Sequence, residues 1–312
     1  LVGSEMCIRD RLTTSLMLTE NILESNLIDD VYNGFGLAVQ AYQQRSTFVI
    51  EWLEKKLKKL NKLMNIRLVK GAYWDTEIKY AQERGLPSYP VFTKKFMTDL
   101  SYLKCAHQLN DSKNIYSQFA THNAFTISYI QKLFGDKRFE FQKLHGMGNE
   151  VYEYFVDKHD FNCRIYAPIG GYNELLPYLV RRLLENGANT SFIYQLHKQD
   201  IDIDNLAESP LSKIDKIDKN NLPMPKKLFT NRDNSNGLDL SEEENVRLIS
   251  ELPKLNNLSI SSIINGQPTK SKTHLDIISP YDHSQILGKV YYANDEDIDF
   301  AIKSLESFSQ LW

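Results

Sequence analysis

The sequence predicts an α/β fold, because short apolar runs of strand length alternate with longer amphipathic runs of helical period. The alternation repeats five times between residues 36 and 186. Composition agrees with a folded protein, since 42% of the 312 residues are hydrophobic and 25% are charged. A chain of this length has room for up to two domains of roughly 150 residues each.

Each predicted element rests on its local pattern. Residues 12–27 place leucine and isoleucine at helical spacing, which predicts a first helix. The predicted strands are short and rich in apolar or aromatic residues, and they span 36–42, 66–74, 115–121, 139–145 and 164–167. Helices are predicted after them over 48–64, 90–109, 124–134, 149–157 and 174–186. Consecutive units of strand, loop and helix are typical of a parallel sheet, whose carboxyl ends carry the functional groups.

The two flanks of this region differ from it in composition. Residues 1–11 fit no element upstream of the first helix and resemble translated adapter sequence, so we leave them out of the fold. Residues 201–240 are rich in Asp, Lys, Asn and Ser and predict a solvated linker.

Residues 241–312 begin with a capping box at Ser241 and Glu244. Two β-hairpin patterns follow, at 263–268 and 276–290, and then a helical pattern at 295–312 that runs to the last residue without a cap. We therefore expect the chain to be part of a longer protein.

Charge and composition exclude several classes of function. A net charge of −3 gives no reason to expect a nucleic-acid partner. No apolar stretch approaches the length of a membrane span. Three widely spaced cysteines form no metal or disulfide pattern, which favours a reducing cytoplasmic compartment.

Arg181 and Arg182 stand side by side in the last predicted helix, just before Gly187. Arginine grips carboxylates through two parallel hydrogen bonds, and neighbours about 100° apart on a helix converge on one anion only at the edge of a pocket. Tyr166, near the end of the preceding strand, would share that pocket. The alternative is a solvated basic face paired with Glu185, four and three residues further on.

Four blocks in order resemble the proline dehydrogenase domain of bifunctional proline utilization A (PutA) enzymes. They are 67–75 (RLVKGAYWD), 119–124 (FATHNA), 139–148 (FEFQKLHGMG) and 163–192. With the intervening segments the resemblance covers roughly residues 11 to 200. It implies a (β/α)8 barrel that is truncated at its N-terminus, with strands four to eight present in residues 12–200. Residues 241–312 resemble the opening of the aldehyde dehydrogenase-like α/β domain that follows in these enzymes.

The resemblance also implies a reaction. L-proline would bind over the ring of FAD and lose a hydride from C5 to flavin N5, giving Δ1-pyrroline-5-carboxylate, which the second domain converts with NAD to glutamate. Electrons would pass to a membrane quinone, so that a cytoplasmic protein would contact the membrane peripherally during turnover. The full-length protein would be able to form a homo-oligomer.

The resemblance assigns one set of residues to the substrate. Arg181 and Arg182 match the pair that binds the proline carboxylate, and Glu185 matches the acid that holds the second arginine. The full substrate set is Arg181, Arg182, Tyr166, Tyr178, Tyr73, Leu144 and Glu185. For the two tyrosines nearest the arginines, Tyr166 and Tyr178, packing in an aromatic core is the alternative.

A second set is assigned to the cofactor. Arg67 and Lys70 lie three residues apart and face opposite ways on a regular strand, where two buried cations need an anionic partner. Thr93 and Lys94 precede a predicted helix whose first N–H groups can receive phosphate, although the family usually has Arg at position 94. The full cofactor set is Gln40, Arg67, Lys70, Gly71, Ala72, Trp74, Thr93, Lys94, Thr121, His122, Asn123, Asn189, Ser191 and Phe192.

Each of these assignments has a plainer alternative. Gln40 would be an ordinary polar residue at a strand end, Arg67 and Lys70 would pair at the surface, and His122 would be structural. For the whole chain the alternatives are a catalytically silent fragment and a different barrel enzyme that grips a carboxylate. No metal site is expected.

Overall fold

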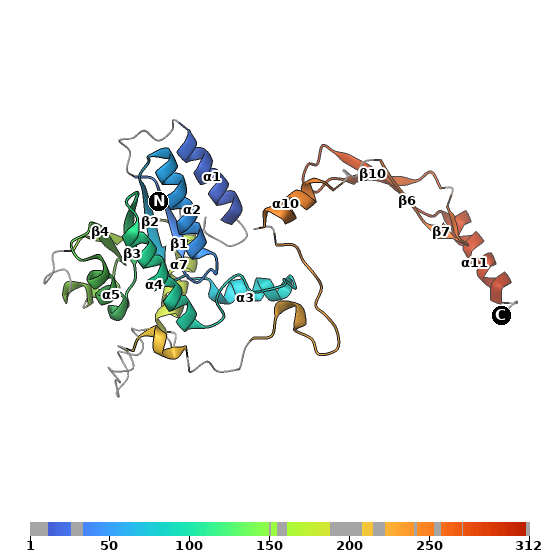
Figure 1. The fold of residues 1–312 in the computed structure, drawn as a ribbon. Helices are drawn as coiled ribbons and strands as arrows, with labels where there is room; N and C mark the ends of the chain where they lie inside the picture. The colour runs from blue at the N-terminus through green and yellow to red at the C-terminus, as the bar shows by residue number, and fades with distance from the viewer. Residues whose placement is uncertain are drawn as a thin grey trace. The chain divides into compact units, whose positions relative to one another are not determined.

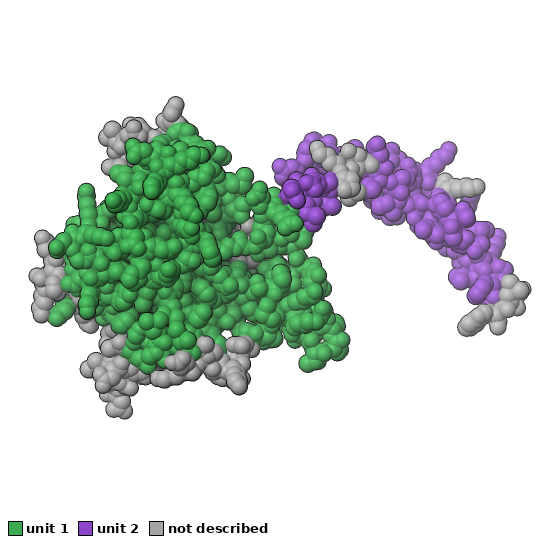
Figure 2. Space-filling model, in the orientation of Figure 1, with its two compact units in different colours: residues 1–246 green, residues 247–312 purple. Residues whose placement is uncertain are grey.

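The computed structural model describes residues 12–25, 34–149, 151–154, 161–187, 208–214, 222–239, 242–252, 257–269 and 271–309. The chain divides into two compact units, residues 1–246 and 247–312, which Figure 2 colours separately. Each unit is described by itself.

Unit 1 is built on a parallel sheet of five strands that lie in the order of the sequence. The strands are β1 (Gly36–Gln40), β2 (Met64–Val69), β3 (Ile115–Ala120), β4 (Phe139–Leu144) and β5 (Cys163–Tyr166) (Figure 1). Because every neighbouring pair is parallel, the carboxyl ends of all five strands lie at the same edge of the sheet. The five predicted strands are thus confirmed, in their predicted order.

Helices connect and flank these strands. They are α1 (Leu12–Glu24), α2 (Ser46–Leu60), α3 (Trp74–Glu83), α4 (Lys95–Asp111), α5 (Ala124–Phe134) and α7 (Tyr172–Gly187). Residues 151–154 are helical, as predicted for 149–157, whereas 155–160 lie outside the described residues. The predicted helix at 90–109 begins instead at Lys95, because Val91 is extended and forms an antiparallel bridge with Gln43. Helix α3 was not predicted.

One face of the sheet packs against the helices. In β2 the side chains of Met64, Ile66 and Leu68 are at most 1% exposed and join one hydrophobic core with α2, α4 and α5. Rings of the same core stack edge to face around Phe119 of β3, 5.0 Å from Phe134 and 5.9 Å from Phe139 between centroids. Alternation along the strands turns the intervening residues to the other face. That face is polar and carries the residues discussed below.

In the segment after α7, the described residues 208–214 and 222–239 are mostly exposed, and the second of these stretches is hydrogen-bonded to the α3 region of unit 1. It contains two short 3₁₀ helices, η3 (Pro210–Lys213) and η4 (Pro225–Lys227). The amide of Asn234 donates to the carbonyl of Gln82 (2.6 Å), and the hydroxyl of Tyr89 donates to the carbonyl of Pro223 (2.8 Å). Residues 222–239 therefore run along α3 and the loop that follows it.

Unit 2 contains a mixed sheet of β6 (Leu258–Ser261), β10 (Ile286–Tyr291) and β9 (His274–Ile278), in that order. A hairpin joins β7 (Ile263–Ile264) to β8 (Gln267–Pro268), and its turn residues Asn265 and Gly266 both have positive φ. Helix α11 spans Asp295–Ser309, and the division of the chain into units falls within the sequence of α10 (Glu243–Ser250). Both predicted hairpins and the last helix are confirmed, while Ser241 of the predicted capping box lies outside the described residues.

Candidate active site

Arg67 and Tyr166 meet across the polar face of the sheet. The guanidinium carbon of Arg67 lies 4.5 Å from the centroid of the Tyr166 ring. Arg67 projects from β2 and Tyr166 from β5, so the two side chains reach across β3 and β4 to touch. A cation over an aromatic face is attracted by the ring quadrupole. The arrangement brings together one residue predicted for the cofactor and one predicted for the substrate.

Arg67 still has hydrogen-bonding capacity. Its Nε is buried and has no hydrogen-bond partner among the described residues. A buried donor on a cation that stays unpaired is costly, which favours an anionic or carbonyl group as its partner.

Lys70 follows β2 and turns to the opposite side, as its spacing from Arg67 predicts. Its ammonium group bonds the carboxylate of Asp99 on α4 at 2.5 Å and lies 5.9 Å from the Tyr102 ring centroid. The side chains of the pair are 29% and 20% exposed. Lys70 thus has a carboxylate partner of its own. Asp99 was missed by the sequence reasoning, because nothing local links it to a lysine 29 positions earlier.

The turn after β2 is shaped by close packing. Gly71 has a φ of +129°, and a Cβ at this position would lie 2.5 Å from the ring of Tyr42. Trp74 packs against the buried cluster that contains Tyr42, and its indole Nε1 donates to the carbonyl of Phe92 at 2.7 Å. Ala72 is exposed, and Tyr73 is the N-cap residue of α3.

His122 is held in a neutral form at the end of β3. The backbone N–H of Leu144 donates to its Nε2 at 3.4 Å, which makes Nε2 an acceptor and leaves the proton on Nδ1. Burial lowers the pKa of His122 from 6.5 to about 4, and the charges of Arg182 and Lys143 act in the same direction. Gly148 makes room for the ring, since a Cβ there would lie 2.8 Å from its Cδ2. His122 can therefore present an N–H donor without carrying a charge.

The neighbours of His122 have structural tasks. The carbonyl of Thr121 accepts a hydrogen bond of 2.5 Å from the buried hydroxyl of Tyr152. Asn123 is the N-cap of α5, and its side chain accepts from the backbone N–H of Thr126 at 2.9 Å and from its hydroxyl at 3.0 Å. An Asn directly before a predicted helix is a capping signal that the sequence already contained.

Helix α7 contributes Arg182 and Tyr178. The guanidinium carbon of Arg182 lies 5.6 Å from the centroid of the Tyr178 ring, one turn earlier. Its charge also acts on His122, which lies at the end of β3. Arg182 is therefore near enough to His122 for its charge to lower the pKa of that imidazole. The side chains of Arg181 and Glu185, and residues Asn189, Ser191 and Phe192, lie outside the described residues.

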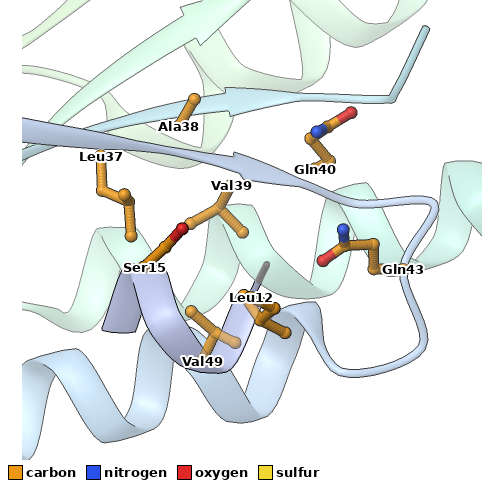
Figure 3. A pocket seen from close by; sticks show the side chains of 8 residues that line it. All are labelled: Leu12, Ser15, Leu37, Ala38, Val39, Gln40, Gln43 and Val49. Atoms are coloured by element: carbon orange, nitrogen blue, oxygen red, sulfur yellow. The ribbon is translucent and has the colours of Figure 1, made fainter. Parts of the chain in front are cut away.

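The remaining described residues of the two predicted sets come from β1, β4 and the segment before α4. Leu144 is 5% exposed and pairs in register with Tyr166. Thr93 and Lys94 come just before the first residue of α4, and Lys94 has no side-chain capping bond. Gln40 ends β1, is 3% exposed and lines a pocket between β1, α1 and α2 (Figure 3). The other lining residues are Leu12, Ser15, Leu37, Ala38, Val39, Gln43 and Val49.

The part of the chain that the structure describes shows no group of three or more His, Cys, Asp or Glu side chains placed to hold a metal ion. Within the same residues, no helix is both long and apolar enough to span a membrane.

Comparison with known proteins places these features in a family. The model of the family described as proline dehydrogenase matches residues 5–195. The bifunctional protein PutA of Klebsiella aerogenes is 39% identical over 97% of this chain and 25% of the relative. That of Escherichia coli is 40% identical, over 97% of this chain and 24% of the relative. The chain thus spans about a quarter of the length of these relatives.

Solved structures agree with the sequence relatives. A mutant of PutA from Bradyrhizobium japonicum superposes with a TM-score of 0.72 at 43% identity, covering 77% of this chain and 25% of that one. PutA from Bdellovibrio bacteriovorus gives a TM-score of 0.68 at 28% identity, covering 98% of this chain and 32% of that one. The parallel sheet, the strand order and the family match all agree, and the chain belongs to the proline dehydrogenase family.

Proposed function

We propose that this chain is part of a bifunctional PutA-type protein and supplies much of an FAD-dependent proline dehydrogenase site. L-proline would be oxidised to Δ1-pyrroline-5-carboxylate, which a second, NAD-dependent domain would carry on to glutamate. The observation that carries the proposal is the convergence of Arg67, Tyr166, His122 and Arg182 near the carboxyl ends of parallel strands.

The residues fit a flavin in three respects. Arg67 has a buried Nε that needs a partner, which a polar or anionic group of the flavin ring would provide. His122 is neutral with a proton on Nδ1, so it can donate to the cofactor without adding charge. Thr93 and Lys94 precede the 17-residue helix α4, whose first N–H groups suit a pyrophosphate. When bound, FAD accepts the two electrons that proline loses.

The protein's own part is to bind and orient the substrate and to exclude water. Arg181 and Arg182 would hold the proline carboxylate, with Glu185 fixing the second guanidinium. Tyr178 lies beside Arg182 and would form a wall of the site, while Tyr166, Tyr73 and Leu144 would enclose the ring of the substrate. Gln40, Lys70, Gly71, Ala72, Trp74, Thr121, Asn123, Asn189, Ser191 and Phe192 would complete the surroundings of the cofactor.

The wider arrangement is proposed from the family resemblance. Unit 1 would form strands four to eight of a (β/α)8 barrel, and the order of its five strands, which never reverses, supports this. Residues 241–312 would open an aldehyde dehydrogenase domain. Electrons would pass to a membrane quinone from a cytoplasmic protein that touches the membrane peripherally, and the full-length protein would be able to form a homo-oligomer.

The test uses the full-length protein that contains this sequence. Its flavin absorbance would be recorded without oxygen before and after addition of L-proline. Bleaching is expected for the parent, and Arg182→Met is expected to need about a hundredfold more proline, because a charged hydrogen-bonding partner is lost. Arg232→Met serves as the matched control, since Arg232 is an exposed arginine of the linker. A flavin that is indifferent to proline would refute the proposal.

A specific observation favours a second possibility for the chain on its own. In the sheet of unit 1, β1 and β5 each pair with a single described strand, so both edges are open. The chain by itself would then be catalytically silent. Expressing residues 12–312 alone and measuring bound flavin separates the cases, because a flavin-free chain beside an active full-length protein identifies a silent fragment.

A further inference from the structure

Glu140 is a buried carboxylate on the polar face of the sheet, and its hydrogen-bond partners among the described residues belong to neither the proposed substrate set nor the proposed cofactor set. It is 4% exposed. Arg164 on β5 holds it with two bonds, Nε to Oε1 at 2.9 Å and Nη2 to Oε2 at 3.0 Å. Gln142 donates to Oε1 at 2.8 Å, and the hydroxyl of Tyr116 approaches Oε2 at 3.5 Å. A fork of two parallel bonds fixes direction as well as distance.

Electrostatics favour the charged form of this group. Burial acts against the carboxylate, yet the hydrogen bonds from Arg164 and Gln142 outweigh it and hold the pKa of Glu140 below its ordinary value. The pair is unequal in exposure, since the Arg164 side chain is 63% exposed and that of Glu140 is 6% exposed. Ion pairs contribute little net stability in general, whether they are exposed or buried, so stability alone is a weak reason for this half-exposed pair.

The position of Arg164 gives a better reason. Arg164 and Tyr166 are two residues apart on β5, so their side chains leave the same face of the strand. Strand β5 has four residues and pairs with β4 alone among the described strands. Its backbone ladder is therefore short, and the fork between Arg164 and Glu140 is a second tie that holds β5 to β4.

Small movements of β5 would matter at Tyr166. Between β2 and β5 lie three strand spacings, about 14 Å in a flat sheet. Arg67 and Tyr166 nevertheless bring the guanidinium carbon and ring centroid to 4.5 Å. A contact made across this span depends on the direction in which the side chains of β5 point. Because Tyr166 is long, a small rotation of β5 would displace its ring by a larger distance.

We propose that Glu140 is a positioning residue of the proline site, which clamps Arg164 and thereby holds Tyr166 against Arg67. The inference rests on the proposed function, because it takes the Tyr166 ring as a wall of that site. The proposal predicts that removing the charge of Glu140 weakens the binding of proline, although Glu140 lies near the amino end of β4 and the proposed site lies at the carboxyl ends of the strands.

The test compares steady-state kinetics of the flavin-loaded, full-length protein with L-proline. Glu140→Gln keeps the shape of the side chain and removes its charge. We expect its KM to rise about tenfold, less than the hundredfold that a misplacement of 1 Å can cost, while kcat and bound flavin change by less than about twofold. Tyr116→Phe is the matched control, because it removes the longest bond to Glu140 and leaves the Arg164 fork in place. Its KM should stay within about twofold of the parent.

A double variant separates positioning from general destabilisation. If Glu140 acts through Tyr166, then Glu140→Gln should add no further rise in KM when Tyr166→Ala is already present, because coupled residues are not additive. Should Glu140→Gln fail to retain flavin, Arg164→Lys serves the same comparison, since lysine keeps the charge but loses the two-bond fork.

Two results would overturn the positioning role in an active parent. One is a KM for Glu140→Gln that stays within about twofold of the parent. The other is a KM for the double variant that is raised by the product of the two single-variant increases, which would show that the residues act independently. A parent whose flavin ignores proline refutes the proposed function, and the positioning role falls with it.

Discussion

The neutral state of His122 makes the stability of unit 1 depend on pH in a calculable way. Its pKa is about 4 in the folded protein against an ordinary value of 6.5. Between these values the unfolded chain binds more protons at this site than the folded one, so stability rises with pH across the window. The contribution is fully present above pH 6.5 and is lost progressively as the pH falls from 6.5 through 4.

The magnitude follows from the two pKa values. Proton linkage gives a loss of about 2 kcal/mol between pH 7 and pH 5, and about 3 kcal/mol by pH 4. The upper part of the window is the useful one, because most carboxylates titrate below pH 5.

The assay is urea unfolding of the chain, followed by circular dichroism at pH 7 and pH 5. Replacing His122 by Gln should reduce the difference between the two pH values by about 2 kcal/mol, since the amide does not titrate. His107→Gln is the matched control, because His107 is exposed and its Nε2 lies 2.8 Å from the hydroxyl of Tyr129. An equal pH dependence in the parent and in His122→Gln would refute the reasoning.

Two further predictions concern the residues that follow β2, namely the close packing of Gly71 and the ion pair of Lys70. Gly71→Ala should lower the free energy of unfolding by about 2 kcal/mol or more, because its Cβ would lie 2.5 Å from the Tyr42 ring at a φ of +129°. Gly135→Ala, whose Cβ would meet nothing within 4 Å at a φ of +53°, should cost clearly less, and equal thermal midpoints would contradict the steric argument. Asp99→Asn should cost about 1–3 kcal/mol in urea unfolding, because it removes the partner of Lys70, and an unchanged midpoint would show that the pair contributes nothing.

The sequence predicted the architecture of unit 1 well, because that architecture follows from local patterns. Alternation of residues such as Met64, Ile66 and Leu68 defines a half-buried strand, and its burial confirms the pattern. The beginning of α4 was wrong by five residues, because the bridge between Val91 and Gln43 keeps the preceding segment extended. Helix bounds of this kind depend on contacts that are distant in the sequence.

The candidate site was predictable in composition but not in geometry. Motifs indicated Arg67, His122 and Tyr166, and the structure finds them near the carboxyl ends of the strands. They did not indicate that Asn123 would be used as a helix cap, although an Asn before an apolar helix is a local signal.

What the sequence determined by itself is therefore the order of strands and helices, the face of each strand that is apolar, and the membership of the proline dehydrogenase family. Only the tertiary structure determined which partner each charged side chain contacts. Lys70 forms an ion pair with Asp99, 29 positions away in the sequence, and Glu140 forms one with Arg164, 24 positions away. Arg67 contacts the ring of Tyr166 across two intervening strands. The physical reason is that periodicity records whether a side chain is buried, whereas its partner is chosen by the curvature and register of the whole sheet.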